Sequence, residues 1–205
     1  MNNQAEDGLI YGRLGQRCVH LCIDMQRMFH SETPWHTPWI KRICPAVERL
    51  ASARPKQTIF TRFIPPLRAG DVAGSWRHYY ERWSCMTRAE LDPMMLDLIP
   101  ALIRHVPPAF VFDKESYSPF LSGRLEIRLR EQQVETSVVS GAETDVCVLA
   151  TVLDAIDRGY RVIVARDAIC SSTNQTHDAL LGLYQSRFRQ QIETASVDEI
   201  IEAWV

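Results

Sequence analysis

Three residues with chemically reactive side chains follow apolar segments of the chain: a carboxylate, an ammonium group and a thiol. Asp24 and Lys114 come at the ends of two such segments, and Cys147 comes shortly after a third, which stops at Gly141. The segments are 17–24, 109–113 and 136–140. Short apolar runs are typical of buried parallel strands, whose carboxyl ends meet at one edge of the sheet. We therefore expect the three groups to converge, with the carboxylate available as a base and the thiol as a nucleophile.

The position of Cys147 favours a reactive thiol. Thr144 is the predicted N-cap of the next helix, which puts Cys147 in its first turn. There the helix dipole and unpaired N–H groups favour a thiolate, and the ammonium group of Lys114 would add to this effect. Taken alone, Cys147 is equally consistent with a buried helical cysteine. Three reactive groups at three strand ends favour a catalytic site, in which Cys147 would be the most reactive thiol.

The rest of the chain alternates strand-like and helix-like segments. The predicted strands are 17–24, 57–62, 109–113, 136–140, 160–165 and 191–194, and the predicted helices are 37–53, 92–105, 123–133, 145–158, 176–188 and a terminal helix from 197. Such alternation implies a single-domain α/β fold: a doubly wound, mostly parallel six-stranded sheet with helices on both faces, a Rossmann-like three-layer α/β/α arrangement. The stretch 63–88 is too long for a simple connection, so we expect it to serve a site or an interface.

Composition and charge narrow the class of protein. The chain has 205 residues, enough for one full core, and 46% apolar with 23% charged residues is ordinary for a globular protein. A net charge of -2 gives no reason to expect a nucleic acid or a membrane surface as partner, and no apolar run approaches the ~20 residues of a membrane span. The cysteines form no CxxC pair, which favours a reduced, cytoplasmic protein. Residues 1–16 are expected to form a flexible N-terminal arm.

Four further side chains are candidates for binding a substrate: Phe29, Arg62, Trp76 and Tyr117. Arg62 follows the second predicted strand as Asp24 follows the first, so it is a candidate to bind a substrate carboxylate, although a surface arginine is equally consistent. Phe29 and Tyr117 come just after predicted catalytic strand ends and are candidate pocket walls. Trp76 begins an aromatic stripe with helical spacing. The stripe consists of Trp76, Tyr79, Tyr80 and Trp83. It favours a helix packed on the core or on another subunit, and the alternative is an aromatic wall over the pocket.

Several blocks of the sequence resemble the signature blocks of isochorismatase-like cysteine hydrolases. They are residues 21–26 (LCIDMQ), 113–114 with 117–120 (DK, YSPF) and 140–148 (SGAETDVCV), and the segment 162–172 continues the match. The resemblance runs from about residue 17 to the C-terminus, and the Gly-x-x-Thr-Asp-x-Cys pattern in it is specific. It implies that the chain consists of the arm, 1–16, and one isochorismatase-like hydrolase domain, 17–205.

The resemblance implies a role for each candidate residue. Asp24, Lys114 and Cys147 would be the catalytic triad, and the peptide bond between Ala142 and Glu143 would be cis. The N–H groups of Glu143 and Cys147 would then form an oxyanion hole. The implied reaction is hydrolysis of a C–N bond in a small planar amide or ureide through a thioester, with a carboxylate as an optional feature of the substrate. A homo-oligomer, a dimer or tetramer, is also implied.

The sequence departs from its metal-dependent relatives. Nicotinamidases of this superfamily carry an Asp-x-His motif after the second strand, whereas residues 60–66 read FTRFIPP. Because the histidines also lack ligand spacing, we expect no bound metal and no cofactor. True isochorismatases, which cleave a vinyl ether, typically lack the nucleophilic cysteine, so Cys147 favours amide hydrolysis. A vinyl ether hydrolase and a non-catalytic oligomeric member of the fold stay open as alternatives. A dehydrogenase is disfavoured because no GxGxxG follows the first strand.

Overall fold

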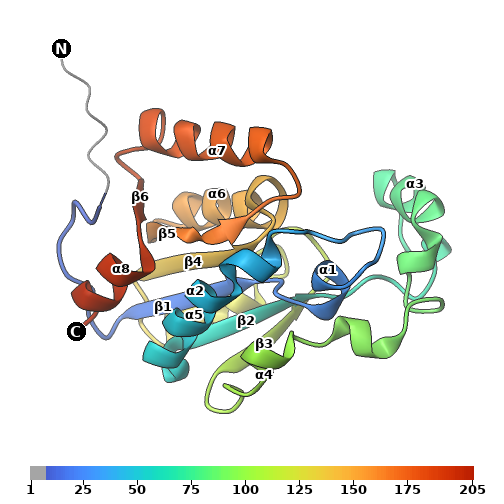
Figure 1. The fold of residues 1–205 in the computed structure, drawn as a ribbon, viewed down its shortest axis with the longest axis horizontal. Helices are drawn as coiled ribbons and strands as arrows, with labels where there is room; N and C mark the ends of the chain where they lie inside the picture. The colour runs from blue at the N-terminus through green and yellow to red at the C-terminus, as the bar shows by residue number, and fades with distance from the viewer. Residues whose placement is uncertain (1–7) are drawn as a thin grey trace.

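The computed structural model describes residues 8–205, which contain a six-stranded sheet. The strands are β1 (Cys18–Ile23), β2 (Thr58–Phe63), β3 (Phe110–Lys114), β4 (Thr136–Ala142), β5 (Arg161–Cys170) and β6 (Ile192–Ala195). Their order is β3-β2-β1-β4-β5-β6, and every neighbouring pair is parallel. The doubly wound α/β fold expected from the sequence is therefore confirmed (Figure 1). β1 and β4 lie side by side at its centre, where the strand order reverses and such sheets bind ligands.

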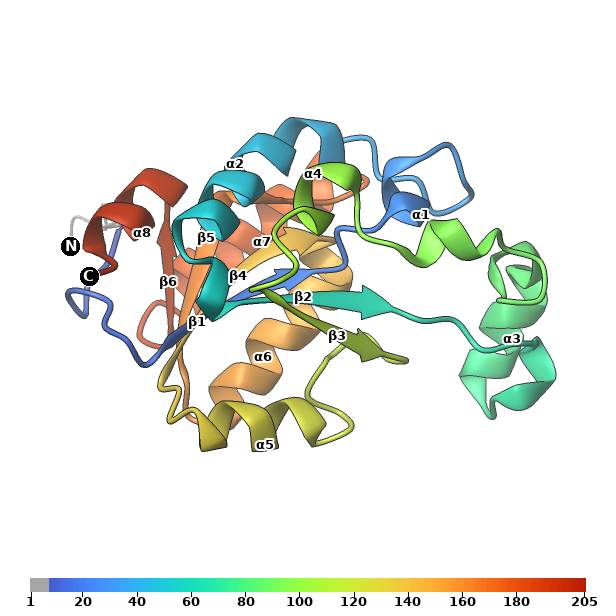
Figure 2. The same cartoon turned by 90° about the horizontal axis from the view of Figure 1, so that it is seen from below.

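Helices cover both faces of this sheet. They are α1 (Arg27–His30), α2 (Ile40–Ala53), α3 (Ser75–Arg82), α4 (Pro100–Ile103), α5 (Arg124–Glu131), α6 (Leu149–Asp157), α7 (Asn174–Ser186) and α8 (Val197–Ala203). One core cluster joins α2, α4 and α8 to one face of the strands, and a second joins α5, α6 and α7 to the other, which gives the three layers seen in Figure 2. No helix within residues 8–205 has the length and apolar character needed to cross a membrane.

Two predicted helices differ in the structure. The segment 92–105 is not one helix but the 3-10 turn η4 (Pro93–Leu96) followed by the short α4. Pro100 explains the break: it lacks the N–H that a continuing helix needs, but it suits the first position of a new one. The predicted helix 145–158 begins as the wider π-helical turn η5 (Thr144–Val148) and continues as α6.

The stretch between β2 and β3 forms an excursion that extends beyond the strand ends and carries α3 (Figure 2). Its aromatic stripe packs within this chain, in a cluster whose buried members are Met28, Phe63, Tyr80 and Met86. Gln26, just after β1, holds the base of the excursion. Its Oε1 accepts a hydrogen bond from the Phe63 N–H (2.7 Å), and its Nε2 donates to the Leu96 carbonyl (2.8 Å). The excursion is therefore fastened to the end of the central strand.

Residues 8–16 do not form the loose arm that was expected for residues 1–16. Leu14 is buried, its N–H donates to the Ala203 carbonyl, and its own carbonyl accepts from the Val205 N–H, both at 2.9 Å. The Tyr11 N–H donates to Glu193 in β6 (3.1 Å). An apolar side chain and paired backbone groups thus attach this segment to the C-terminal end of the domain. Residues 1–7 lie outside the described part of the chain.

Gly141 allows the two central strands to approach each other just before the site. Its φ of +107° lies in a region that L side chains rarely adopt. A Cβ atom at this position would overlap the backbone of Ile23 in β1, with its carbonyl oxygen as the nearest atom. Only glycine lets β1 and β4 pair this closely, and their next residues lead directly to Asp24 and to Cys147.

His20 links the three central strands through a buried polar contact. Its Nδ1 lies 3.2 Å from the Thr58 hydroxyl in β2, and its Nε2 lies 2.7 Å from the Ser140 hydroxyl in β4. Burial lowers the pKa of His20 from 6.5 to about 3. The unfolded chain therefore accepts a proton at this residue below about pH 6.5, whereas the folded chain does so only near pH 3.

Acid should weaken the fold through His20. The stability contributed by its neutral imidazole is complete above pH 6.5 and falls towards pH 3, by at most ~1.4 kcal/mol for each pH unit. Denaturant unfolding across this range should show a shallower pH dependence for His20→Gln than for the native chain. His78→Gln, at an exposed position in α3, is the matched control and should keep the native slope. Equal slopes for the native chain and His20→Gln would contradict this account.

Candidate active site

Asp24, Lys114 and Cys147 meet at the carboxyl edge of the sheet, beyond β1, β3 and β4. Lys114 Nζ lies 2.7 Å from Asp24 Oδ2 and 3.5 Å from Cys147 Sγ. It also donates to the Ser116 carbonyl (2.9 Å), so the ammonium group is fully used within the protein. The Lys114 and Asp24 side chains are only 2% and 1% exposed. A charged pair buried this deeply needs each partner, because removing one leaves an isolated buried charge.

Backbone conformation and a threonine hold Asp24 in place. Asp24 adopts a left-handed φ of 49°, which aspartate tolerates better than most residues and which is often found at functional sites. The Thr61 hydroxyl, from β2, donates to Asp24 Oδ1 (2.6 Å) and accepts from the Asp24 N–H (3.1 Å). Asp24 Oδ2 accepts a hydrogen bond from the Lys114 ammonium group at 2.7 Å, and the Cys147 thiol is also within hydrogen-bonding reach of this carboxylate. A carboxylate oxygen has two lone pairs, so Oδ2 can still accept a proton.

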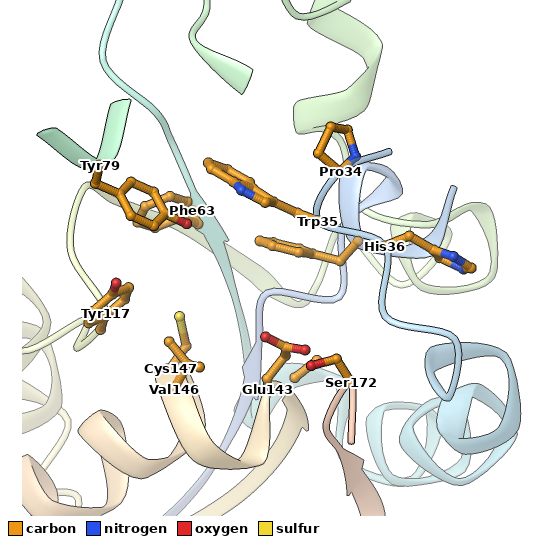
Figure 3. A pocket seen from close by; sticks show the side chains of 12 residues that line it. Pro34, Trp35, His36, Phe63, Tyr79, Tyr117, Glu143, Val146, Cys147 and Ser172 are labelled. Atoms are coloured by element: carbon orange, nitrogen blue, oxygen red, sulfur yellow. The ribbon is translucent and has the colours of Figure 1, made fainter. Parts of the chain in front are cut away.

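Cys147 lies in the first helical turn after β4, as expected, but the turn is capped differently. Thr144 does not cap it: the preceding residue is the N-cap, and the Thr144 hydroxyl lies 2.9 Å from His177 Nδ1 instead. The Thr151 hydroxyl donates to the Cys147 carbonyl (2.6 Å), which ties the wide turn to α6. Cys147 is 7% exposed, and Figure 3 shows its thiol pointing into an open cavity.

Electrostatics favour a neutral thiol that is activated by a base. Burial, the largest effect, raises the pKa of Cys147, the Lys114 ammonium lowers it, and Asp24 raises it again. The net direction is upward, so the expectation of a resting thiolate is not supported. Burial lowers the pKa of Lys114, but Asp24 and Cys147 outweigh it and keep that pKa above its ordinary value. Lys114 therefore stays charged, and Asp24 is the group placed to remove the thiol proton. None of the six cysteines forms a disulfide bond, so the sulfur of Cys147 is present as a thiol.

The peptide bond between Ala142 and Glu143 is cis in the structure. The Glu143 N–H donates no hydrogen bond to any described residue. The Cys147 N–H belongs to the first turn of the helical segment, where backbone donors have few intrahelical partners. Two donors next to the nucleophile are the requirement for binding a developing oxyanion.

The thiol opens onto a cavity of ≈ 290 Å³, large enough for a small molecule and not for a macromolecular substrate. Its lining includes five aromatic side chains and one carboxylate: Phe29, Trp35, Phe63, Tyr79, Tyr117 and Glu143. Figure 3 shows Tyr79 and Tyr117 on one side, Trp35 opposite the thiol, and the carboxylate of Glu143 on the floor. The cavity is thus an aromatic box with a nucleophile and a carboxylate at its base. Phe29 and Tyr117 lie in the lining, where the sequence analysis expected them.

Arg62 does not reach this cavity. Its guanidinium makes two hydrogen bonds to Asp113, at 2.7 and 2.8 Å, and a third to Asp97 at 3.3 Å. Successive side chains of a strand point to opposite faces, and it is the neighbouring Thr61 that points toward Asp24. The sequence prediction that Arg62 binds a substrate carboxylate is therefore wrong.

Trp76 forms a second layer behind the cavity instead of lining it. Its ring lies 4.9 Å from that of Tyr117 and stacks on Tyr80, with centroids 5.9 Å apart. It lines a separate hollow on the outer side of the aromatic cluster, and of the stripe only Tyr79 lines the cavity. Both interpretations of the stripe are thus partly correct, since the helix packs on its own chain and contributes one wall. The expected homo-oligomer stays a prediction.

Several lining residues were not predicted to contact a substrate through their side chains, among them Trp35, Phe63, Glu143 and Ser172. Ser172 comes two residues after the end of β5. The strand predicted from the sequence stopped at residue 165, so reasoning from strand ends did not reach Ser172. Trp35 lies in the connection between α1 and α2, which shows no periodic pattern. Glu143 was considered only for its backbone N–H, and nothing in the sequence shows where its carboxylate points.

Of the histidines within residues 8–205, His36 lines the cavity and the others lie outside its lining. His177 contacts the Thr144 hydroxyl and packs against the ring of Trp39, with centroids 5.9 Å apart. Burial lowers its pKa. Within residues 8–205, no group of three or more histidine, cysteine or acidic side chains is arranged to hold a metal ion.

The chain belongs to the isochorismatase family, because residues 18–196 match the family model described as Isochorismatase domain. The resemblance seen in the sequence is thus confirmed. An N-carbamoylsarcosine amidase of Arthrobacter is 29% identical over 140 residues, 66% of this chain and 52% of that protein. A maleamate amidohydrolase of Pseudomonas putida is 32% identical over 78 residues, 38% of this chain and 37% of that protein. An uncharacterized isochorismatase family protein of Bacillus subtilis is 33% identical over 88 residues, 43% of this chain and 48% of that protein. The matches span about half or less of these curated relatives.

Solved structures share the whole fold. A cysteine hydrolase from Pseudomonas syringae superposes with a TM-score of 0.80 at 22% identity, over 92% of each chain. An N-carbamoylsarcosine amidase from Thermoplasma acidophilum superposes with a TM-score of 0.70 at 20% identity, over 89% of this chain and 98% of that one. At these identities the likeness concerns the fold, so the chemistry has to be argued from this chain's own residues.

Proposed function

We propose that this protein is a cysteine hydrolase that cleaves the C–N bond of a small amide or ureide and releases ammonia or an amine. One observation carries the proposal: the Cys147 thiol lines a small cavity and contacts a buried ammonium group, which is paired with a buried carboxylate. The amidase and amidohydrolase among the relatives favour this reaction over other reactions of the family. A non-catalytic binding protein would have no use for this buried charged pair beside a thiol.

The first half of the mechanism forms a thioester. Asp24 removes the proton of Cys147, and the thiolate attacks the carbonyl carbon of the amide. The oxyanion that forms accepts hydrogen bonds from the N–H groups of Glu143 and Cys147, each worth ~3 kcal/mol in the transition state. The tetrahedral intermediate then collapses, the C–N bond breaks, and Asp24 returns the proton to the departing nitrogen.

The second half releases the acid. Asp24 removes a proton from a water molecule, which attacks the thioester carbonyl through a second oxyanion in the same site. When the C–S bond breaks, the sulfur receives the proton held by Asp24 and the carboxylic acid leaves. Lys114 stays protonated throughout, which keeps Asp24 oriented and offsets the negative charge as it moves between oxygen and sulfur.

Ammonia release over a panel of small amides, ureides and carbamoyl compounds tests this proposal. We expect at least one compound to yield ammonia and acid in equal amounts, and the rate to be unchanged by a metal chelator, since the Asp-x-His motif is missing. Isochorismate belongs in the same panel. Opening of isochorismate with no release of ammonia or amine from any member would replace amide hydrolysis by vinyl ether hydrolysis. Loss of activity with the chelator would contradict metal independence.

A further inference from the structure

The carboxylate of Glu143 is part of the cavity and belongs to no step of the mechanism above. It points into the cavity beside the thiol, between Cys147 and Ser172 (Figure 3). Its Oε1 accepts a hydrogen bond from the Thr37 hydroxyl at 3.1 Å. Its backbone N–H is a candidate oxyanion donor, but the side chain is a separate group that faces whatever fills the cavity.

No cation compensates this carboxylate in the protein. Among residues 8–205 no lysine, arginine or histidine forms an ion pair with Glu143, and no lysine or arginine lines the cavity. The histidine of the lining, His36, has its ring turned away from Glu143 (Figure 3). Burial is the main influence on Glu143 and raises its pKa, while hydrogen bonds from Ser172 and Thr37 lower it. These hydrogen bonds satisfy the carboxylate in part, but they leave its negative charge available to a cationic ligand in the cavity.

The walls around this carboxylate are aromatic. Phe29 and Trp35 stack on one another with centroids 6.2 Å apart, and Tyr79 lies 5.8 Å from Trp35. Tyr117 completes the lining on the side of the thiol. The faces of aromatic rings attract cations, and rings arranged around a carboxylate form a common binding site for ammonium and amidinium groups.

We propose that the cavity selects amides that carry a cationic nitrogen, an ammonium or amidinium group, and that the side chain of Glu143 determines this preference. The inference rests on the proposed function for the position of the amide at Cys147, and it adds the charge of the substrate. A cationic substrate replaces the substrate with a carboxylate that was expected from the sequence. Arg62 is bound to Asp113, and the cavity itself carries a carboxylate, which would repel a second one.

Binding to the Cys147→Ala variant tests the preference without turnover. The probes are β-alaninamide, butanamide and succinamate, which share a primary amide and differ in the far group: ammonium, methyl or carboxylate. Shorter and longer homologues of each probe cover the distance to the carboxylate. By titration calorimetry we expect the cationic member to bind about 10- to 100-fold more tightly than the neutral one and the anionic member to bind most weakly.

A second substitution assigns the effect to one side chain. Glu143→Gln, added to Cys147→Ala, keeps the backbone N–H and the shape of the side chain but removes its charge. The cationic and neutral probes should then bind equally. Glu115→Gln is the matched control, since that carboxylate faces the outer hollow beyond Trp76 and its loss should leave the preference intact. Equal binding of the two probes before the substitution, or a preference that survives Glu143→Gln, would overturn the proposal.

The outcome separates this inference from the proposed function. Ammonia release by the native chain from neutral amides, together with equal binding of cationic and neutral probes, would leave amide hydrolysis standing and remove the role of Glu143. Selective binding of the cationic probes with no hydrolysis of any amide would support the role of Glu143 and remove amide hydrolysis. Both hold if the native chain hydrolyses the cationic member of each set fastest and Glu143→Gln removes that advantage.

Discussion

Cys147→Ala is expected to abolish turnover, with a loss in kcat of roughly 10⁴-fold or more, as for removal of the nucleophile in other covalent hydrolases. The loss should fall on kcat because the cavity walls stay in place. Stability should change little, because the substitution removes a single sulfur atom that borders an open cavity. Denaturant unfolding of the variant checks this, so that an inactive protein is not confused with an unfolded one.

The covalent intermediate gives a second measure of the same prediction. Rapid acid quenching during turnover should leave a fraction of the chain heavier by the acyl group, and the label should map to the peptide that contains Cys147. Cys85→Ala is the matched control, since this exposed cysteine lies outside the site and its loss should preserve both rate and label. Undiminished ammonia release by Cys147→Ala would remove the thioester mechanism.

Asp24→Asn should lower kcat by ~10²- to 10⁴-fold, because asparagine keeps the size of the side chain but cannot carry the proton between sulfur and the leaving nitrogen. Lys114→Met should lower kcat to a similar degree. It should also reduce the free energy of unfolding by about 3–5 kcal/mol, because the buried Asp24 carboxylate loses its charged partner. Steady-state kinetics and denaturant unfolding measure the two effects separately.

The double variant Asp24→Asn with Lys114→Met distinguishes catalysis from stability. Removing both charges leaves no unpaired ion in the core, so unfolding should recover much of the loss seen in Lys114→Met. Activity should not recover, since the base is absent. An active double variant, or single variants that change only KM, would reassign Asp24 and Lys114 to substrate binding or to structure.

The residues of the site that come at or shortly after strand ends could be predicted from the sequence alone. Buried parallel strands are recognisable as apolar runs, and the edge where they end is common to all of them, so the meeting of Asp24, Lys114 and Cys147 follows from topology alone. The wall residues Phe29 and Tyr117 were found because they come a few residues after the same strand ends.

The wrong predictions concern side-chain direction, burial and long-range contacts, which the order of elements does not determine. Arg62 occupies a strand end, but adjacent strand residues face opposite ways and Thr61 takes the place beside Asp24. The protonation state of Cys147 was misjudged because a helix start favours a thiolate, whereas burial works against it. The arm was misjudged because only the structure shows that Leu14 has a partner surface in the C-terminal helix.

The close pairing of β1 and β4 at Gly141 also bears on how such a site can evolve. Aromatic walls such as Phe29 and Tyr117 border open space, so single substitutions there can change the shape of the cavity and leave the strands intact. At Gly141 any side chain would collide with the backbone of β1, so no sequence of mutational steps can pass through another residue while the two strands stay paired. Substitutions in the cavity walls can therefore change the substrate during evolution. The position of the nucleophile relative to the base is retained, because Gly141 cannot be replaced.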